Sequence, residues 1–233
     1  MTPATAAIVP AAGRGERLGP GTPKALRLLG GAPLLVHAVR SLARARLVDL
    51  VVVAAPPGDV DRVRSLLGDH HAGAALDVVG GGASRQESVR RALAGLPDSV
   101  VTVLVHDAAR PLAPVELVDA VAAAVQGGAL AVVPVLEVAD TVKRVDGDTV
   151  VETLDRTVLR AVQTPQGFAR ATLEEAHVTA GAEEATDDAG LVERLGRTVV
   201  VVPGSPEAFK ITRPLDLVLA EAVLARRRAA GVR

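Results

Sequence analysis

The chain alternates short apolar runs with segments of helical periodicity. Valine, leucine and alanine form runs without regular polar alternation at residues 6–10, 47–55, 76–79, 100–106, 129–135 and 198–202. Uninterrupted runs of this length are typical of strands that are buried on both faces of a sheet. The pattern therefore predicts a sheet that is covered on both sides.

The segments between these runs have the spacing of helices. Apolar residues recur at positions i, i+3, i+4 and i+7 in two of them: Leu35, Ala38, Val39 and Leu42, and, behind Pro214, Leu215, Val218, Leu219 and Ala222. Ser84 and Glu87 have the spacing of a capping box and predict the start of another helix. Alternating strands and helices predict an α/β fold, with a mostly parallel sheet and helices on both faces. Ligands of such sheets bind beyond the carboxyl ends of the strands.

Residues 137–160 interrupt this alternation. Four valines, at positions 142, 145, 150 and 151, flank the pair Asp146-Gly147, which favours a tight hairpin turn. The segment predicts a two-stranded β-arm inserted into the α/β domain. Because an isolated hairpin is marginally stable in water, we expect the arm to pack on another surface, such as a second subunit.

The composition narrows the possible functions. The 233 residues suit one large α/β domain or two small ones, and the net charge of -1 gives no general attraction to nucleic acid or to an acidic membrane. There is no cysteine, which excludes disulfides, thiolate metal sites and a cysteine nucleophile. No apolar run reaches the roughly 20 residues of a membrane helix, and no signal-peptide pattern opens the chain. We expect a cytoplasmic protein that binds neither nucleic acid nor membrane.

The first chemical signal follows the first predicted strand. The string PAAGRGER, residues 10–17, is succeeded by TPK at 22–24. Small residues allow a backbone to approach a ligand, glycines expose N–H groups to phosphate oxygens, and Arg17 and Lys24 add two cations. The dinucleotide fingerprint would need glycine where Leu18 stands, and the Walker loop would need Gly-Lys, whereas Lys24 follows Pro23. A flexible surface loop is the alternative, but the position after a buried strand favours a nucleotide triphosphate site.

Three later clusters lie where strands are predicted to end. The string GGGASRQES, residues 80–88, opens a helix, and its backbone and Ser88 could contact a base or ribose; a simple capped helix start is the alternative. VHDAARP, residues 105–111, ends a strand with Asp107, which could bind Mg²⁺ beside substrate phosphates or merely cap a turn. His106 is interpreted as a structural histidine. FKITRP, residues 209–214, brings Lys210, and the arginine run 226–228 is interpreted as a solvated helix end.

Taken together and in this order, the motifs resemble those of the 2-C-methyl-D-erythritol 4-phosphate cytidylyltransferases. The resemblance covers nearly the whole chain and rests on the strings PAAGRGERLG...PK, GGASRQESV, VHDAARP, DTVKR, LDRT, TPQ, TDDAG and FKITRP. It implies a single Rossmann-like nucleotidyltransferase domain over residues 1–233, with the β-arm at 137–160 locking a homodimer. It also implies that Mg²⁺ assists a transfer from CTP to the sugar-alcohol phosphate.

The resemblance also implies residue roles. The nucleotide loop would be lined by Ala11, Ala12, Gly13 and Gly15, while Gly82, Ala83 and Ser88 would contact cytosine and ribose. Arg17, Lys24 and Lys210 would be catalytic, and Asp107 would lie on the metal and ribose side. The incoming phosphate would be surrounded by Arg110, Thr141, Arg156, Thr164 and Lys210, with Thr141 and Arg156 arriving on a partner's arm. Relatives often carry a polar residue at Ala83 and Asp-Asn-Ile where this chain has 207–209.

Two other functions remain compatible with these motifs. A cytidylyltransferase for another alditol phosphate, such as ribitol 5-phosphate, would share the nucleotide loop and the HDA motif. A binding or regulatory protein on the same fold would retain CTP affinity without turnover. The HDAARP and KITRP strings favour the methylerythritol enzyme over the first, and the cations and the carboxylate of the four clusters argue against the second.

Overall fold

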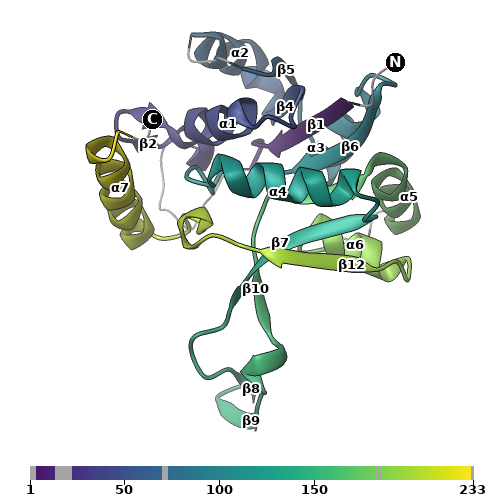
Figure 1. Ribbon diagram of the computed structural model, residues 1–233, viewed down its shortest axis with the longest axis vertical. Helices are drawn as coiled ribbons and strands as arrows, with labels where there is room; N and C mark the ends of the chain where they lie inside the picture. Colours follow the sequence, from purple (N-terminus) through teal and green to yellow (C-terminus); the bar gives the residue numbers. More distant parts are fainter. Residues whose placement is uncertain (1–3, 14–22, 70–72, 182, 184, 232–233) are drawn as a thin grey trace.

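The computed structural model describes residues 4–13, 23–69, 73–181, 183 and 185–231 of the chain. Its centre is a sheet in which strands follow the order β10-β7-β11-β6-β1-β4-β5, with β12 pairing to β7 beside this path (Figure 1). The pairs β1–β4, β1–β6, β4–β5 and β7–β12 are parallel, whereas β11 lies antiparallel between β6 and β7. The prediction of a mostly parallel α/β sheet is confirmed.

The main strands lie where the apolar runs predicted them. They are β1 (Ala4–Pro10), β4 (Leu50–Ala55), β5 (Ala75–Gly80), β6 (Val100–Val105), β7 (Ala131–Glu137) and β12 (Val199–Pro203). No apolar run indicated the short strands β2 (Leu28–Leu29), β3 (Ala32–Pro33), β10 (Arg160–Val162) and β11 (Gln166–Ala169). The run QGFA of β11 is too short to show a period, and its pairing on both sides is a tertiary property.

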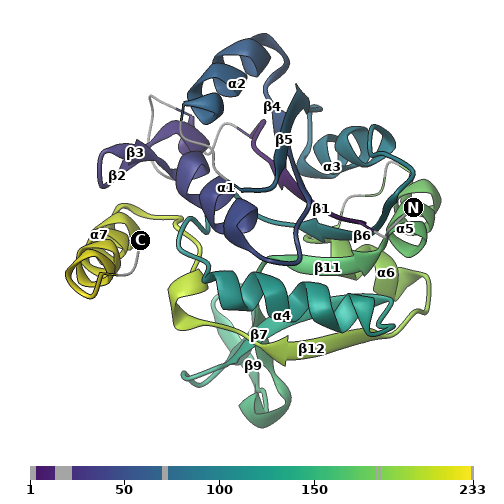
Figure 2. The same ribbon diagram turned by 45° about the horizontal axis from the view of Figure 1, so that its top comes forward.

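Helices cover both faces of the sheet. They are α1 (Leu34–Arg44), α2 (Val60–Gly68), α3 (Arg85–Ala94), α4 (Val115–Gln126), α5 (Arg170–Ala180), α6 (Asp188–Arg194) and α7 (Pro214–Ala229). Short 3-10 turns are η2 (Lys24–Leu26), η3 (Pro57–Asp59), η4 (Arg156–Val158) and η5 (Pro206–Ala208). Figure 2 shows α1 and α4 on one side of the sheet and α3, α5 and α6 on the other.

Successive side chains of one strand enter two different cores. Ala7 and Val9 of β1 pack with α1, α2 and α4, whereas Ala6 and Ile8 pack with α3, α5 and α6. All four are fully buried. Burial on both faces explains why this strand is apolar without alternation. Among the described helices, none combines the length and apolar character that crossing a bilayer requires.

The last helix packs with a face that the sequence pattern did not indicate. The helix itself is confirmed as α7, but Leu215, Val218 and Leu219 are exposed by 75%, 65% and 52%. Leu217, Ala220, Val223 and Leu224 lie instead against a small cluster formed by Leu29, Leu34, Leu112 and Ile211. Both stripes have helical spacing, so periodicity alone could not choose between them. The arginine run 226–228 was expected to be a solvated helix end. In the structure, Arg226 and Arg227 form ion pairs with Glu207.

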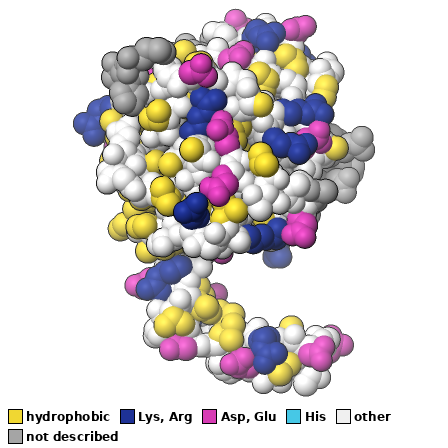
Figure 3. Space-filling view, turned by 90° about the vertical axis from the view of Figure 1, so that its right-hand side faces the viewer, with side chains coloured by type: hydrophobic (Ala, Val, Ile, Leu, Met, Phe, Trp, Pro, Cys, Tyr) yellow, Lys and Arg dark blue, Asp and Glu magenta, His cyan; other side chains and the backbone are white. Residues whose placement is uncertain are grey.

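A two-stranded hairpin within residues 137–160, called the arm below, stands away from the body of the molecule (Figure 1). Strands β8 (Lys143–Asp146) and β9 (Thr149–Thr153) form the hairpin, and Gly147 takes a positive φ of 53° in the turn. Every residue of both strands is exposed. Figure 3 shows the arm projecting from the body with hydrophobic side chains on its surface. At its base β10 pairs with β7, where Arg160 lies opposite Glu137, so the two ends of the arm lie side by side.

Candidate active site

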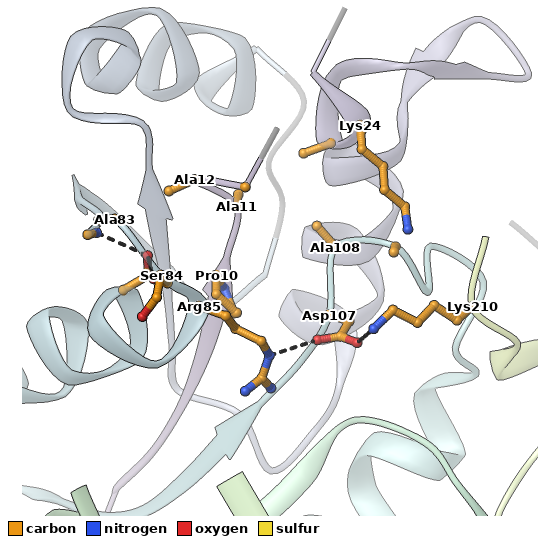
Figure 4. Close-up of a pocket in the computed structure, with 15 residues that line it drawn as sticks. Pro10, Ala11, Ala12, Lys24, Ala83, Ser84, Arg85, Asp107, Ala108 and Lys210 are labelled. Atoms are coloured by element: carbon orange, nitrogen blue, oxygen red, sulfur yellow. Dashed lines mark hydrogen bonds and ion pairs between the residues drawn. The ribbon is translucent and has the colours of Figure 1, made fainter. Parts of the chain in front are cut away.

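One pocket lies beyond the carboxyl ends of β1 and β6, where the fold class places ligands. Its lining comes from all four clusters of the sequence: Pro10–Gly13, Lys24 and Ala25, Gly82–Arg85 with Ser88, Asp107–Ala109, and Lys210. The predicted residues Ala11, Ala12, Gly13, Lys24, Gly82, Ala83, Ser88, Asp107 and Lys210 therefore meet in one place (Figure 4). Gly15 and Arg17 lie outside the described residues.

The first two loops approach each other closely. A Cβ on Gly81 would lie 2.8 Å from the Cβ of Ala12 and 3.1 Å from the carbonyl oxygen of Ala55. A side chain at position 81 would therefore push the two loops apart. The Gly81 N–H donates to the Ala55 carbonyl at 2.7 Å, which ties the second loop to the end of β4.

The second loop is held in shape by the first turn of α3. Ser84 caps the helix by accepting from the Glu87 N–H, as the capping box predicted. Ser88 Oγ accepts from the Gly82 N–H at 3.0 Å and donates to the Ser84 carbonyl at 2.8 Å. The Glu87 carboxylate, however, accepts from the Ala83 N–H at 2.8 Å and not from that of Ser84. Two N–H groups of the loop are thus already paired with side chains of its own helix.

Asp107 lies between two cations that come from distant parts of the chain. Its Oδ2 is 2.7 Å from Lys210 Nζ, and its Oδ1 is 3.3 Å from Arg85 Nε (Figure 4). Burial by itself would raise the pKa of Asp107, but Arg85 and Lys210 together outweigh burial and hold that pKa well below its usual range. The carboxylate is therefore ionised at neutral pH.

Arg85 is a pocket residue to which the sequence motifs assigned no role. Its Nη1 lies 2.6 Å from Oδ2 of Asp188, and Asp188 Oδ1 is 3.0 Å from Nε2 of His177. Asp188 and His177 are almost fully buried, whereas the Arg85 side chain is 31% exposed. Burial alone would lower the pKa of Arg85, but the carboxylates of Asp188 and Asp107 raise it. Both motifs, GGASRQESV and TDDAG, were visible in the sequence, but nothing there showed that they meet.

His106 is structural, as its sequence context indicated. It is fully buried, and burial lowers its pKa to about 4. Thr164 Oγ1 accepts the Asp107 N–H at 3.0 Å, so its hydroxyl proton can be donated to His106 Nδ1 at 3.1 Å. His106 Nε2–H then donates to the Arg110 carbonyl at 3.1 Å. A neutral imidazole in one tautomer thereby connects the backbones of Asp107 and Arg110.

The five residues expected around the incoming phosphate do not share one space in the single chain. Lys210 lines the pocket, and Arg110 lies beside it, donating to the carbonyls of Ala208 at 2.7 Å and Val162 at 3.2 Å. Thr164 is buried, and its hydroxyl would have to break its hydrogen bond to His106 before it could donate to a phosphate. Thr141 and Arg156 are exposed on the arm, where Arg156 donates to the carbonyls of Val138 and Ala139.

The donor set of the pocket suits a hard divalent cation that is shared with phosphates. Asp107 supplies an ionised carboxylate oxygen pair, and Mg²⁺ needs only one or two carboxylates when phosphates and water supply its other ligands. Within the described ranges, no three aspartate, glutamate or histidine side chains gather into a cage of protein ligands. A metal here would therefore depend on the substrate for much of its coordination.

A carboxylate with cations around it, at the carboxyl edge of a mainly parallel sheet, suits an α/β enzyme that binds phosphate groups. A family model described as 2-C-methyl-D-erythritol 4-phosphate cytidylyltransferase matches residues 5–226. The chain belongs to this family of cytidylyltransferase enzymes.

Individual relatives agree with the family match. The chain is 61% identical to the cytidylyltransferase of this description from Streptomyces coelicolor, over 96% of this chain and 86% of the relative. It is 62% identical to the enzyme of the same description from Frankia casuarinae, over 97% of this chain and 83% of the relative. The crystal structure of 2-C-methyl-D-erythritol 4-phosphate cytidylyltransferase from Thermus thermophilus is similar with a TM-score of 0.76 at 42% identity. The match covers 97% of this chain and 100% of that one. The crystal structure of 4-diphosphocytidyl-2C-methyl-D-erythritol synthase from Anaerococcus prevotii is similar with a TM-score of 0.83 at 29% identity. The match covers 96% of this chain and 97% of that one.

Proposed function

We propose that the chain transfers the cytidylyl group of CTP to 2-C-methyl-D-erythritol 4-phosphate. The products are 4-diphosphocytidyl-2-C-methyl-D-erythritol, an isoprenoid precursor of the non-mevalonate pathway, and pyrophosphate. Its family is described by this activity. The observation that carries the proposal is the pocket in which Asp107 lies between Arg85 and Lys210, beside the loop of Ala11–Gly13. We place the activity in the cytoplasm, with which the absence of cysteine is compatible.

The reaction needs no general base. A phosphate oxygen of the alditol phosphate attacks the α-phosphorus of CTP, and the bond to the bridging oxygen of the β-phosphate breaks as pyrophosphate leaves. The second pKa of a phosphate monoester is about 6, so the nucleophile is already largely a dianion at neutral pH. His106, neutral and committed to Thr164 and Arg110, agrees with a site that moves no proton.

The main task of the site is to bring two polyanions together. Two unit like charges about 4 Å apart repel by roughly 4 kcal/mol at an effective dielectric of about 20. Lys24 and Lys210 both line the pocket, on the side across from Ala83 and Arg85 (Figure 4), and offset this repulsion, with Arg17 as a third proposed cation outside the described residues. Catalysis then consists of positioning and of stabilising the charge that develops on pyrophosphate.

The nucleotide is proposed to lie across the first two loops. Ala11, Ala12, Gly13 and Gly15 would follow the triphosphate, and Gly82, Ala83 and Ser88 would contact cytosine and ribose. A Cβ on Gly13 would meet nothing within 4 Å among the described atoms, which leaves room for close approach of a ligand. The cytosine amino group is a donor, so a backbone contact to it would use a carbonyl oxygen of this loop, while the Ala83 N–H donates to Glu87.

Mg²⁺ is the cation that we propose for this site. Asp107 would hold it, and when bound it would neutralise charge on the phosphates. Arg85 and Lys210 keep the carboxylate ionised and oriented.

The second substrate is proposed to bind between two subunits. Residues 1–233 would form one nucleotidyltransferase domain, whose arm at 137–160 builds a homodimer. Thr141 and Arg156 on that arm would complete the phosphate site of Arg110, Thr164 and Lys210 in the partner. The exposed valines of the arm, Val145 and Val150, at 58% and 56%, support an interface there.

A pyrophosphate-release assay with CTP and each of two alcohols tests the function. We expect turnover with 2-C-methyl-D-erythritol 4-phosphate that far exceeds turnover with ribitol 5-phosphate. The reverse preference would assign the chain to the other alditol phosphate. CTP binding without pyrophosphate release from any alditol phosphate would make it a binding protein.

A further inference from the structure

Arg110 and Lys210 are carried by two separate loops. Arg110 belongs to the loop that follows β6, and Lys210 to the segment between β12 and α7. The two loops share one backbone hydrogen bond, from the Ile211 N–H to the Ala109 carbonyl at 2.8 Å. The distance between the two cations therefore depends on what else holds these loops together.

A side chain of the last helix contacts both loops. Arg227 Nη2 donates to the carbonyl of Leu112 at 2.7 Å, and Arg227 Nε donates to Glu207 Oε2 at 2.7 Å. Arg226 forms a further ion pair with Glu207. Leu112 lies two residues after Arg110, and Glu207 lies three residues before Lys210. One guanidinium thus bridges the two segments that deliver the phosphate-binding cations.

The contact continues from Glu207 to Arg110. Glu207 lies in the turn η5, and the next residue, Ala208, is fully buried against Ala113 and Leu117. The Ala208 carbonyl accepts from Arg110 Nη1 at 2.7 Å. A shift of η5 would therefore move the acceptor that orients the Arg110 side chain.

The burial of the pair favours a defined geometry. The side chains of Arg227 and Glu207 are 22% and 25% exposed, whereas Arg226 is 69% exposed. Partly buried, charge-assisted hydrogen bonds are stronger than those of solvated pairs, and the planar guanidinium suits two acceptors at once. Neither Arg227 nor Glu207 lines the pocket, so neither touches a substrate there.

We propose that Arg227 and Glu207 are positioning residues that fix Arg110 relative to Lys210 for the incoming alditol phosphate. The inference rests on the proposed function, because it assigns the pair to the second substrate of that reaction. It gives the C-terminal helix a role in the active site, although none of the described residues of α7 lines the pocket.

The test compares Arg227→Gln and Arg227→Lys with a control on the same helix. Arg228→Gln removes the same charge, but the hydrogen bond of Arg228 goes to the Gly30 carbonyl, at 3.0 Å, and to neither loop. We expect Arg227→Gln to raise KM for the alditol phosphate about tenfold, with KM for CTP changed by less than about twofold. Arg227→Lys should lie in between, since a lysine can reach one acceptor but not both, and Arg228→Gln should match the wild type. Glu207→Gln should reproduce the KM split of Arg227→Gln.

A parallel rise of both KM values, or an equal effect of Arg228→Gln, would contradict the proposal, as would normal kinetics of Arg227→Gln. Amide hydrogen exchange provides a readout that does not need turnover. The Ile211 amide should exchange faster in Arg227→Gln than in the wild type and Arg228→Gln, and unchanged exchange would also contradict the proposal. Wild type that releases no pyrophosphate would overturn the proposed function alone, whereas an active wild type with an unaffected Arg227→Gln would overturn only this inference.

Discussion

Single residues in this site act through neighbours that are remote in the sequence. Asp107 is ionised because Arg85 and Lys210, 22 and 103 residues away along the chain, offset its burial. For His106, the adjacent residue, burial outweighs the attraction of the Asp107 carboxylate, so the imidazole stays neutral. Two neighbouring side chains at the end of one strand thus have opposite electrostatic roles, one as an anion in the pocket and one as an uncharged link below it.

Lys210→Met is expected to lower kcat by roughly 10²- to 10³-fold, because it removes a charge that offsets the repulsion between the substrates. Its side chain is 39% exposed, so we expect a change of less than about 1 kcal/mol in the free energy of unfolding. Pyrophosphate release and urea unfolding on the same preparation measure both. Loss of folding together with activity would show that the ion pair with Asp107 is mainly structural.

His106 predicts a pH dependence of stability. Its pKa falls from 6.5 in the unfolded chain to about 4 in the folded one, so the unfolded state binds the proton first. The stabilisation is complete above pH 6.5 and is lost as the pH falls towards 4, by up to about 3 kcal/mol. Urea unfolding in metal-free buffer between about pH 7 and 4 should show this slope, and His106→Gln should flatten it. A wild-type curve without slope in that window would contradict the neutral, buried histidine.

Among the elements, α7 shows where a sequence pattern stops being informative. Leu215 and Leu217 are equally apolar and two positions apart, yet only Leu217 packs on the cluster of Leu29 and Ile211. We expect Leu217→Ala to cost about 1–2 kcal/mol of unfolding free energy and Leu215→Ala less than about 0.5 kcal/mol. Chemical denaturation of the matched pair measures the difference. Equal costs would show that the outer stripe of α7 is also covered in solution.

For the whole molecule, mixing two inactive variants tests the proposal that the arm of each subunit completes the active site of its partner. Lys210→Ala and Arg156→Ala should each be nearly inactive. If the arm of one subunit completes the site of the other, mixed dimers contain one site with both changes and one with neither. Random mixing should then restore about a quarter of the wild-type activity. Mixtures that stay inactive, with sedimentation showing that dimers had exchanged, would place Arg156 in its own subunit's site. An Arg156→Ala variant that is itself active would place Arg156 outside any site.

The sequence by itself determined the long strands, the hairpin, the helices α1, α3 and α7, and the identity of the chemical clusters. Buried parallel strands need continuous apolar runs, a hairpin needs a turn such as Asp146-Gly147, and a phosphate site needs small residues beside cations, so each leaves a local trace. Nine of the predicted site residues meet in one pocket because their motifs all follow strand ends on one edge of the sheet.

The tertiary structure alone decided which partners those residues have. Arg85 reaches Asp188 across 103 positions, β11 enters the sheet antiparallel, and Arg227 joins two loops that the chain separates. Contacts of this kind are fixed by packing between distant segments and leave no periodicity in the sequence. The same is true of the packed face of α7, where two apolar stripes were available and the cluster beneath the helix selected one.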